Sequence, residues 1–181
     1  MKLEEASFLA DGVRCALTPY CFRLEVAGSI RRGKAEVGDI DIVAMAKPVT
    51  VPSPLGVGSV TYNESKIWKD LIPAKLKKCG LKVEASGQEL LRCTFLDGFQ
   101  VDIYRARPET WGVILLVRTG SKEHNVKLCT LARSKGLKLS ASEGLVAQGG
   151  FGQIIASRSE EEIFSALGLA YVEPNYREEH F

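Results

Sequence analysis

The stretch from residue 28 to residue 41, GSIRRGKAEVGDID, limits what this chain can fold into more than any other part of the sequence. Alternating apolar residues precede it (22–26) and apolar residues follow it, which predicts a strand, a basic turn and a second strand. Successive side chains of a strand point to opposite faces, so Asp39 and Asp41 share one face. Carboxylates about 7 Å apart on one strand repel each other, and oxygen ligands suit Mg²⁺ or Mn²⁺. The pair is therefore a candidate metal site.

The start of the same stretch carries groups that bind phosphate. Gly28 and Ser29 stand at a strand end and offer backbone amides and a hydroxyl, and Arg32 adds a guanidinium. All three groups donate hydrogen bonds to phosphate oxygens. Each fragment alone is common as a solvated strand edge or a basic turn. Their combination with two acids at this spacing indicates a site.

A third acid, Asp102, lies in the segment GFQVDIY (98–104), whose alternation predicts a strand. An Asp97–Gly98 turn precedes that strand, so the strand is expected to return antiparallel to the one before it. The 61 residues from Asp41 to Asp102 leave room for a helix and further strands before the chain comes back. We therefore expect Asp102 to join the first two acids.

Together these motifs resemble the nucleotidyltransferase signature of the DNA polymerase beta superfamily, in particular its family X version. The resemblance continues through TGSKEHN (119–125) and LARSKGLKL (131–139) to EEEIFSALGLAYVEPNYRE (160–178). It covers about residues 7 to 178.

The resemblance implies a DNA-directed DNA polymerase that transfers a nucleotide from a (d)NTP to a primer 3′-hydroxyl and releases pyrophosphate. Short-gap filling in DNA repair is the expected role, with primer-template or gapped DNA as the partner. Two Mg²⁺ ions would neutralise the developing charge, and Mn²⁺ would be accepted in their place.

The resemblance also assigns roles to single residues. Asp39 and Asp41 are expected to bridge both ions, and Asp102 to complete the ion that activates the primer hydroxyl. The triphosphate-binding residues are expected to be Ser29, Arg32, Val37 and Gly38, and the residues against the sugar and base Val117, Arg118, Gly120, Ser121 and Asn125.

Two departures from the family pattern bear on specificity. Val117 and Arg118 stand where the family has an aromatic pair before its TGS, so the preference between dNTP and rNTP stays open. Cys129 stands where the vertebrate polymerase carries an arginine facing the template, so template dependence and fidelity stay open as well.

The expected fold is α+β, with a mixed, largely antiparallel palm sheet flanked by helices and a small α/β C-terminal lobe. We expect the palm at residues 1–106 and the nucleotide- and template-facing lobe at 107–181, without a lyase or helix-hairpin-helix domain. Pattern and breakers predict helices over 4–17 and 63–79 and a Pro-rich loop over 47–58.

Composition sets outer limits on the protein. A net charge of +2 is too small to argue for nucleic-acid binding by itself. No apolar run is long enough to span a bilayer, and the start MKLEEAS does not resemble a signal peptide, so we expect a soluble, cytoplasmic protein without a membrane partner. We also expect a monomer. Five scattered cysteines predict free thiols, and the histidines, His124 and His180, lack zinc-ligand spacing.

Two other functions compete with the polymerase interpretation. The first is another nucleotidyltransferase on the same palm, which is template-independent or modifies an RNA end, a protein or a small molecule. The second is a DNA-end-binding or scaffolding domain with a decayed site. The match beyond Asp102 argues against the first, and three facing acids argue against the second.

Overall fold

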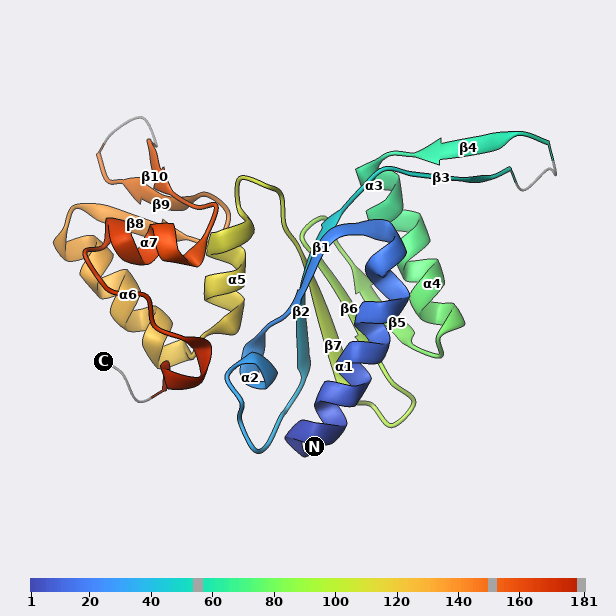
Figure 1. Cartoon of the computed structure of the whole chain (residues 1–181), viewed down its shortest axis with the longest axis horizontal. Helices are drawn as coiled ribbons and strands as arrows, with labels where there is room; N and C mark the ends of the chain where they lie inside the picture. The colour runs from blue at the N-terminus through green and yellow to red at the C-terminus, as the bar shows by residue number, and fades with distance from the viewer. Residues whose placement is uncertain (54–56, 150–152, 179–181) are drawn as a thin grey trace.

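The computed structural model describes residues 1–53, 57–149 and 153–178. Figure 1 shows a larger lobe, which comprises the elements from α1 to β7, beside a smaller C-terminal lobe, which comprises those from α5 to η3. The sequence-based prediction of an α+β fold is confirmed, since a five-stranded sheet with both parallel and antiparallel pairs is flanked by helices.

The sheet of the larger lobe has the strand order β1-β2-β7-β6-β5, and only the β2–β7 pair is parallel. This pair is the one that brings Asp41 beside Asp102. The five strands are β1 (Cys21–Val26), β2 (Ile40–Ala46), β5 (Lys82–Ser86), β6 (Leu90–Thr94) and β7 (Gln100–Arg105).

Alternation along β2 explains why both faces of the sheet are covered. Ile40 and Ile42 are fully buried in a core cluster with residues of α1 and α4, whereas Val43 belongs to a second cluster with the C-terminal lobe. Asp39 and Asp41 precede Val43 on that second face, where the apolar cover has not yet begun. The same face therefore changes from charged to apolar along one strand.

The two longest helices of the larger lobe, α1 and α4, pack on the sheet face that carries Ile40 and Ile42. The expected helix over 4–17 is confirmed as α1, and α1 and α4 contact each other (Figure 1). The helical elements are α1 (Leu3–Leu17), η1 (Thr18–Tyr20), α2 (Gly28–Arg31), α3 (Glu64–Lys66), the π-helical η2 (Ile67–Leu71) and α4 (Ile72–Lys78).

Two expectations for this lobe were partly wrong. The basic turn begins as the short helix α2. The predicted loop over 47–58 contains the strand β3 (Val49–Pro52), which pairs with β4 (Ser59–Tyr62) just after it, and residues 54–56 of that loop lie outside the described residues. The β-branched residues Thr50 and Val51 favour extended backbone, and Thr50 Oγ1 lies 2.8 Å from Thr61 Oγ1 across the hairpin. Pro52 is compatible with a strand because this two-stranded sheet has free edges.

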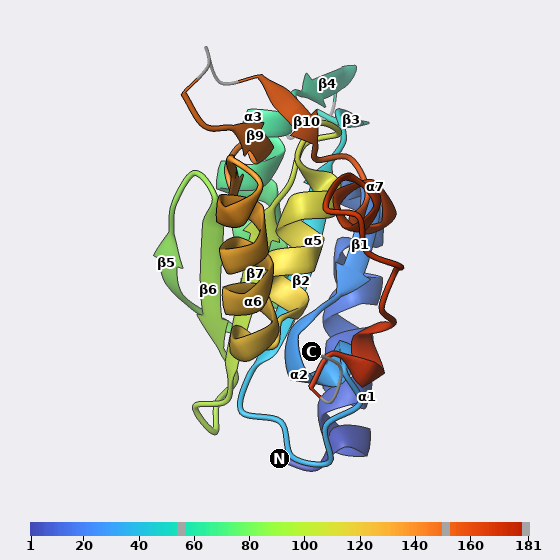
Figure 2. The same ribbon diagram turned by 90° about the vertical axis from the view of Figure 1, so that its left-hand side faces the viewer.

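The C-terminal lobe packs three helices around a small antiparallel sheet. Figure 1 places α5 between α6 and the large sheet, and Figure 2 shows α6 nearest the viewer on that side. Helix α5 is buried along most of its length, as its apolar sequence predicts. A Cβ at Gly112 would lie 2.3 Å from the Ser159 backbone, so glycine lets α5 approach α7. The elements are α5 (Trp111–Thr119), α6 (Lys122–Ser134), β8 (Leu137–Ser140), β9 (Gly144–Ala147), β10 (Ile154–Ala156), α7 (Glu160–Ala166) and η3 (Pro174–Tyr176).

Helix caps follow the sequence signals. Ser121 Oγ accepts from the His124 backbone N–H at 3.3 Å and begins α6, and Ser159 Oγ accepts from the Glu162 N–H at 3.1 Å and begins α7. Within the described ranges, no helix combines the length and the apolar character needed to cross a membrane.

Candidate active site

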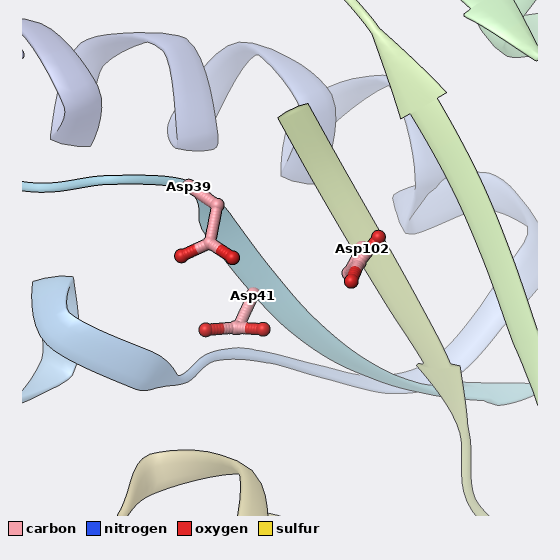
Figure 3. A group of neighbouring side chains, drawn as sticks. All are labelled: Asp39, Asp41 and Asp102. Atoms are coloured by element: carbon pink, nitrogen blue, oxygen red, sulfur yellow. The ribbon is translucent and has the colours of Figure 1, made fainter. Parts of the chain in front are cut away.

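The three predicted acids meet at one end of the β2–β7 pair (Figure 3). Asp39 immediately precedes β2, Asp41 is the second residue of β2, and the parallel register pairs Asp41 directly with Asp102 on β7. One carboxylate oxygen of each residue lies within 4.8 Å of the others. We call this group the acidic triad.

The acidic triad is electrostatically unfavourable as it stands. Burial, followed by the neighbouring Asp39 carboxylate, raises the pKa of Asp41 to about 6. Burial, followed by Asp102, also raises the pKa of Asp39. Three converging carboxylates form a donor set of hard oxygens, so the site fits a divalent ion such as Mg²⁺ or Mn²⁺.

Glycine at position 28 is required for the close approach of α2 to the acidic triad. Gly28 has a φ of 59°, and a Cβ there would lie 2.0 Å from Asp41 Oδ2. Any side chain at this position would push α2 away from β2. The glycine of the sequence motif thus has a steric reason as well as a conformational one.

Asp102 has partners that the sequence analysis missed. It is 2% exposed, and the Arg92 guanidinium binds it with two hydrogen bonds, Nε to Oδ1 at 2.8 Å and Nη2 to Oδ2 at 2.7 Å. Gln100 Nε2 and the Tyr104 hydroxyl also donate to Oδ2, at 3.2 and 3.3 Å. A hairpin centred on Asp97–Gly98 pairs residue 92 with residue 102, so the turn signal could have identified Arg92.

A cleft of about 600 Å³ lies beside the acidic triad, between the two lobes. Basic side chains of both lobes line it, as suits an anionic ligand: Arg32, Arg118, Lys122 and Arg133. Eight of the residues predicted from sequence line it: Ser29, Arg32, Asp39, Asp41, Val117, Arg118, Gly120 and Asn125.

The other four predicted residues do not line this cleft. Asp102 lies behind Asp41, held by Arg92. Val37 is 2% exposed and its N–H donates to the Met1 carbonyl, while Gly38 lies on the surface. Ser121 is buried and its hydroxyl caps α6.

Ser29 and Arg32, both expected to bind phosphate, border the cleft. Ser29 Oγ is buried and has no hydrogen-bond partner among the described residues, although it borders the cleft. Arg32 donates through Nη1 to the Thr119 carbonyl and through Nε to Glu178 Oε1 at 2.9 Å. Lys34 Nζ lies 3.0 Å from the same Glu178 oxygen. A carboxylate of the C-terminal segment thus lies where two cations converge.

Three comparisons with known proteins bear on this geometry. A family model for the DNA polymerase beta thumb matches residues 114–178. DNA polymerase lambda of Rattus norvegicus is 29% identical over 201 aligned residues, which cover 98% of this chain and 33% of that protein. The crystal structure of Leishmania infantum polymerase beta, a ternary P/T complex, superposes with a TM-score of 0.74 at 20% identity, over 98% of this chain and 76% of that one. The chain therefore spans about a third of its curated relative.

The chain is similar to DNA polymerases of family X in sequence and in fold. The match to the lambda polymerase runs through both lobes, and the thumb model covers most of the C-terminal lobe. The resemblance stated from the sequence motifs is therefore confirmed.

Val117 and Arg118, the residues in place of the aromatic pair, both line the cleft. Arg118 lies with its guanidinium carbon 4.0 Å from the centroid of the Tyr104 ring, and Tyr104 hydrogen-bonds to Asp102. Asn125 Nδ2 donates to the Val117 carbonyl at 2.8 Å, which joins α6 to α5. Arg118 therefore adds a positive charge beside the acidic triad, which the sequence analysis did not anticipate.

We expect the variant Asp41→Asn to be more stable than the parent protein when metal is removed at pH 8. Because the folded-state pKa is raised, the unfolded state loses the Asp41 proton first as pH rises from about 4 to about 6, and stability falls across that window. Well above pH 6 the full cost of about 3 kcal/mol applies. Asparagine removes the charge, so the melting temperature in EDTA should rise by about 6–12 °C.

The same variant should match the parent below pH 4, where both the folded and the unfolded state hold the proton. Asp70→Asn, an exposed site remote from the acidic triad, is the control for loss of one negative charge. Equal melting temperatures of parent and Asp41→Asn at pH 8 in EDTA would contradict the raised pKa of Asp41.

Proposed function

We propose that the chain is a template-directed DNA polymerase of family X that adds a nucleotide from a (d)NTP to a primer 3′-hydroxyl in short gaps. The observation that carries the proposal is the acidic triad beside a cleft lined by Ser29 Oγ and four basic side chains. In this proposal residues 1–106 act as the palm and residues 107–181 as the nucleotide- and template-facing lobe.

The acidic triad would hold two Mg²⁺ ions, or Mn²⁺, which neutralise charge on the reacting phosphate and lower the pKa of the attacking hydroxyl. Asp39, just before β2, and Asp41, on β2, would contribute to both ions, whereas Asp102 would complete one of them. Arg92 holds Asp102 from the opposite side, so the carboxylate keeps its place.

The triphosphate would lie along α2. The Ser29 hydroxyl, unpartnered in the described structure, would donate to a phosphate oxygen, and Arg32 would place its guanidinium on the same chain of phosphates. Val37 and Gly38 would contribute through their backbone. The sugar and base would lie toward Gly120 and the α5–α6 junction, with Val117, Arg118, Ser121 and Asn125 around them.

The proposal is tested by primer extension on a one-nucleotide gapped duplex, with each dNTP and rNTP offered separately and with Mg²⁺ or Mn²⁺. Addition of the complementary nucleotide alone is the expected result. The reactions with rNTPs show whether a site with Val117 and Arg118 accepts a ribose 2′-hydroxyl. Addition without regard to template, or transfer to RNA, protein or a small molecule only, would replace this proposal with another nucleotidyltransferase activity.

We expect Glu178→Gln to lower the KM for the incoming nucleotide by about 2- to 5-fold without changing kcat. Glu178 pairs with both Arg32 and Lys34, so a triphosphate must displace it to reach these cations. Partly exposed ion pairs contribute about 0.2–1 kcal/mol each, which sets this modest size. Steady-state kinetics on gapped DNA measure the effect.

Glu173→Gln is the matched control. Glu173 is an exposed glutamate of the same C-terminal segment, and its substitution removes the same charge. An equal KM in the two variants would show that Glu178 does not compete with the nucleotide.

A further inference from the structure

The Arg92–Asp102 pair is the most specific contact around the acidic triad. Both guanidinium–carboxylate distances, 2.7 and 2.8 Å, correspond to strong charge-assisted hydrogen bonds in a two-point geometry. The antiparallel register places Arg92 directly across from Asp102 on β6, just as the parallel register places Asp41 across from Asp102 on β2. Asp102 is therefore held between an arginine and an acid, one on each neighbouring strand.

The two members of this pair differ in burial. The Asp102 side chain is 3% exposed and the Arg92 side chain is 42% exposed. Arg92 belongs to neither core cluster. Its structural contribution is the ion pair itself, which offsets the free-energy cost of burying the Asp102 carboxylate.

The pair leaves Asp102 able to bind a cation. A carboxylate offers about four lone-pair positions. Oδ2 accepts from Arg92, Gln100 and Tyr104, whereas Oδ1 accepts only from Arg92 Nε among the described residues. The hydrogen bonds from one side therefore fix the carboxylate plane and keep a lone pair on Oδ1.

We propose that Arg92 is a positioning residue, which orients the Asp102 carboxylate as a ligand for the divalent ion of the acidic triad. The inference rests on the metal role given to the triad in the proposed function. In the alternative role, Arg92 only neutralises the charge of Asp102, and its positive charge weakens binding of the metal ion. The two roles predict opposite effects, because loss of a counter-charge strengthens cation binding and loss of an orienting partner weakens it.

The test is Mn²⁺ binding to the protein without DNA or nucleotide, followed by the electron paramagnetic resonance signal of free Mn²⁺. Hydrogen-bonding partners of metal ligands typically contribute about 10- to 100-fold to metal affinity, so Arg92→Gln should weaken Mn²⁺ binding by that factor. Arg92→Lys keeps the charge and loses the two-point geometry, so it should also weaken binding, by about 10-fold. Arg107→Gln is the control, because Arg107 pairs with Glu89 on the surface of the same sheet region.

Kinetics give a second measurement. The Mn²⁺ concentration that gives half-maximal rate should rise in Arg92→Gln. The KM for the nucleotide should stay within about 2-fold, because the proposed triphosphate-binding residues Ser29 and Arg32 lie on or next to α2 and not on β6. Melting temperatures of the three variants establish that each is folded.

The outcomes separate the two proposals. Unchanged or tighter Mn²⁺ binding in Arg92→Gln, with normal primer extension by the parent protein, overturns the role of Arg92 alone. If Arg92→Gln binds Mn²⁺ more weakly but the parent protein extends no primer, the role of Arg92 is supported and the polymerase proposal is overturned.

Discussion

Replacing Asp102 by asparagine is expected to reduce primer extension by at least about a thousandfold. Asparagine has nearly the same shape, but it removes one of the three negative charges that would hold the ions, and it offers Arg92 one acceptor oxygen in place of two. Stabilisation of transition-state charge by a metal is worth several kcal/mol, and about 4 kcal/mol corresponds to this factor. Single-turnover extension of a gapped duplex measures the loss.

The control for this variant is Asp70→Asn, which removes an exposed aspartate of η2. It should extend primers at the rate of the parent protein. Melting temperatures of both variants are needed to show that the loss is chemical. A folded Asp102→Asn protein that retained a tenth or more of the parent rate would exclude Asp102 as a metal ligand in the reaction.

Replacing Glu160 by glutamine is expected to lower the free energy of unfolding by about 3–5 kcal/mol, the usual cost of breaking a buried charge pair. Glu160 is 3% exposed and begins α7. Its carboxylate accepts from Arg31 at 2.7 and 2.9 Å and from Arg177 at 2.8 Å, and the Arg177 side chain is 0% exposed. Glutamine would leave the guanidinium of Arg177 buried without its counter-charge.

The expected fall in melting temperature is about 6–20 °C for a chain of this size. Glu161→Gln is the matched control, because Glu161 is exposed and lies in the same first turn of α7. Burial raises the pKa of Glu160, but hydrogen bonds from Arg31 and Arg177 more than offset this, so its pKa lies below the ordinary value. The stabilisation should accordingly be present above the unfolded pKa and be lost as pH falls. Equal melting temperatures of the two variants would show that the buried network does not stabilise the fold.

The Glu160 network also connects stability to the proposed site. Arg31 belongs to α2, the helix that carries Ser29, and it also donates to Thr119 Oγ1 at 2.7 Å. The C-terminal segment therefore helps to hold α2 against α5. We infer that the consecutive arginines 31 and 32 have different tasks. Arg31 binds the buried Glu160, whereas Arg32, which contacts Thr119 and Glu178, borders the cleft.

The sequence by itself determined the local part of the site. Strand alternation placed Asp39 and Asp41 on one face, and the Asp97–Gly98 hairpin fixed the direction of the strand that carries Asp102. The capping serines and the helix over 4–17 were also readable, because a helix turn or a tight turn depends on residues only a few positions apart.

Only the tertiary structure decided which distant groups surround these acids. The parallel β2–β7 register that pairs Asp41 with Asp102, the buried partner of Arg31 and the pairing of Arg32 with Glu178 join residues 61, 129 and 146 positions apart. A basic turn looks the same in the sequence whether its arginines bind phosphate or a buried glutamate. The choice depends on how the C-terminal lobe packs against α2, and that packing is set by the shape of two apolar cores rather than by any local pattern.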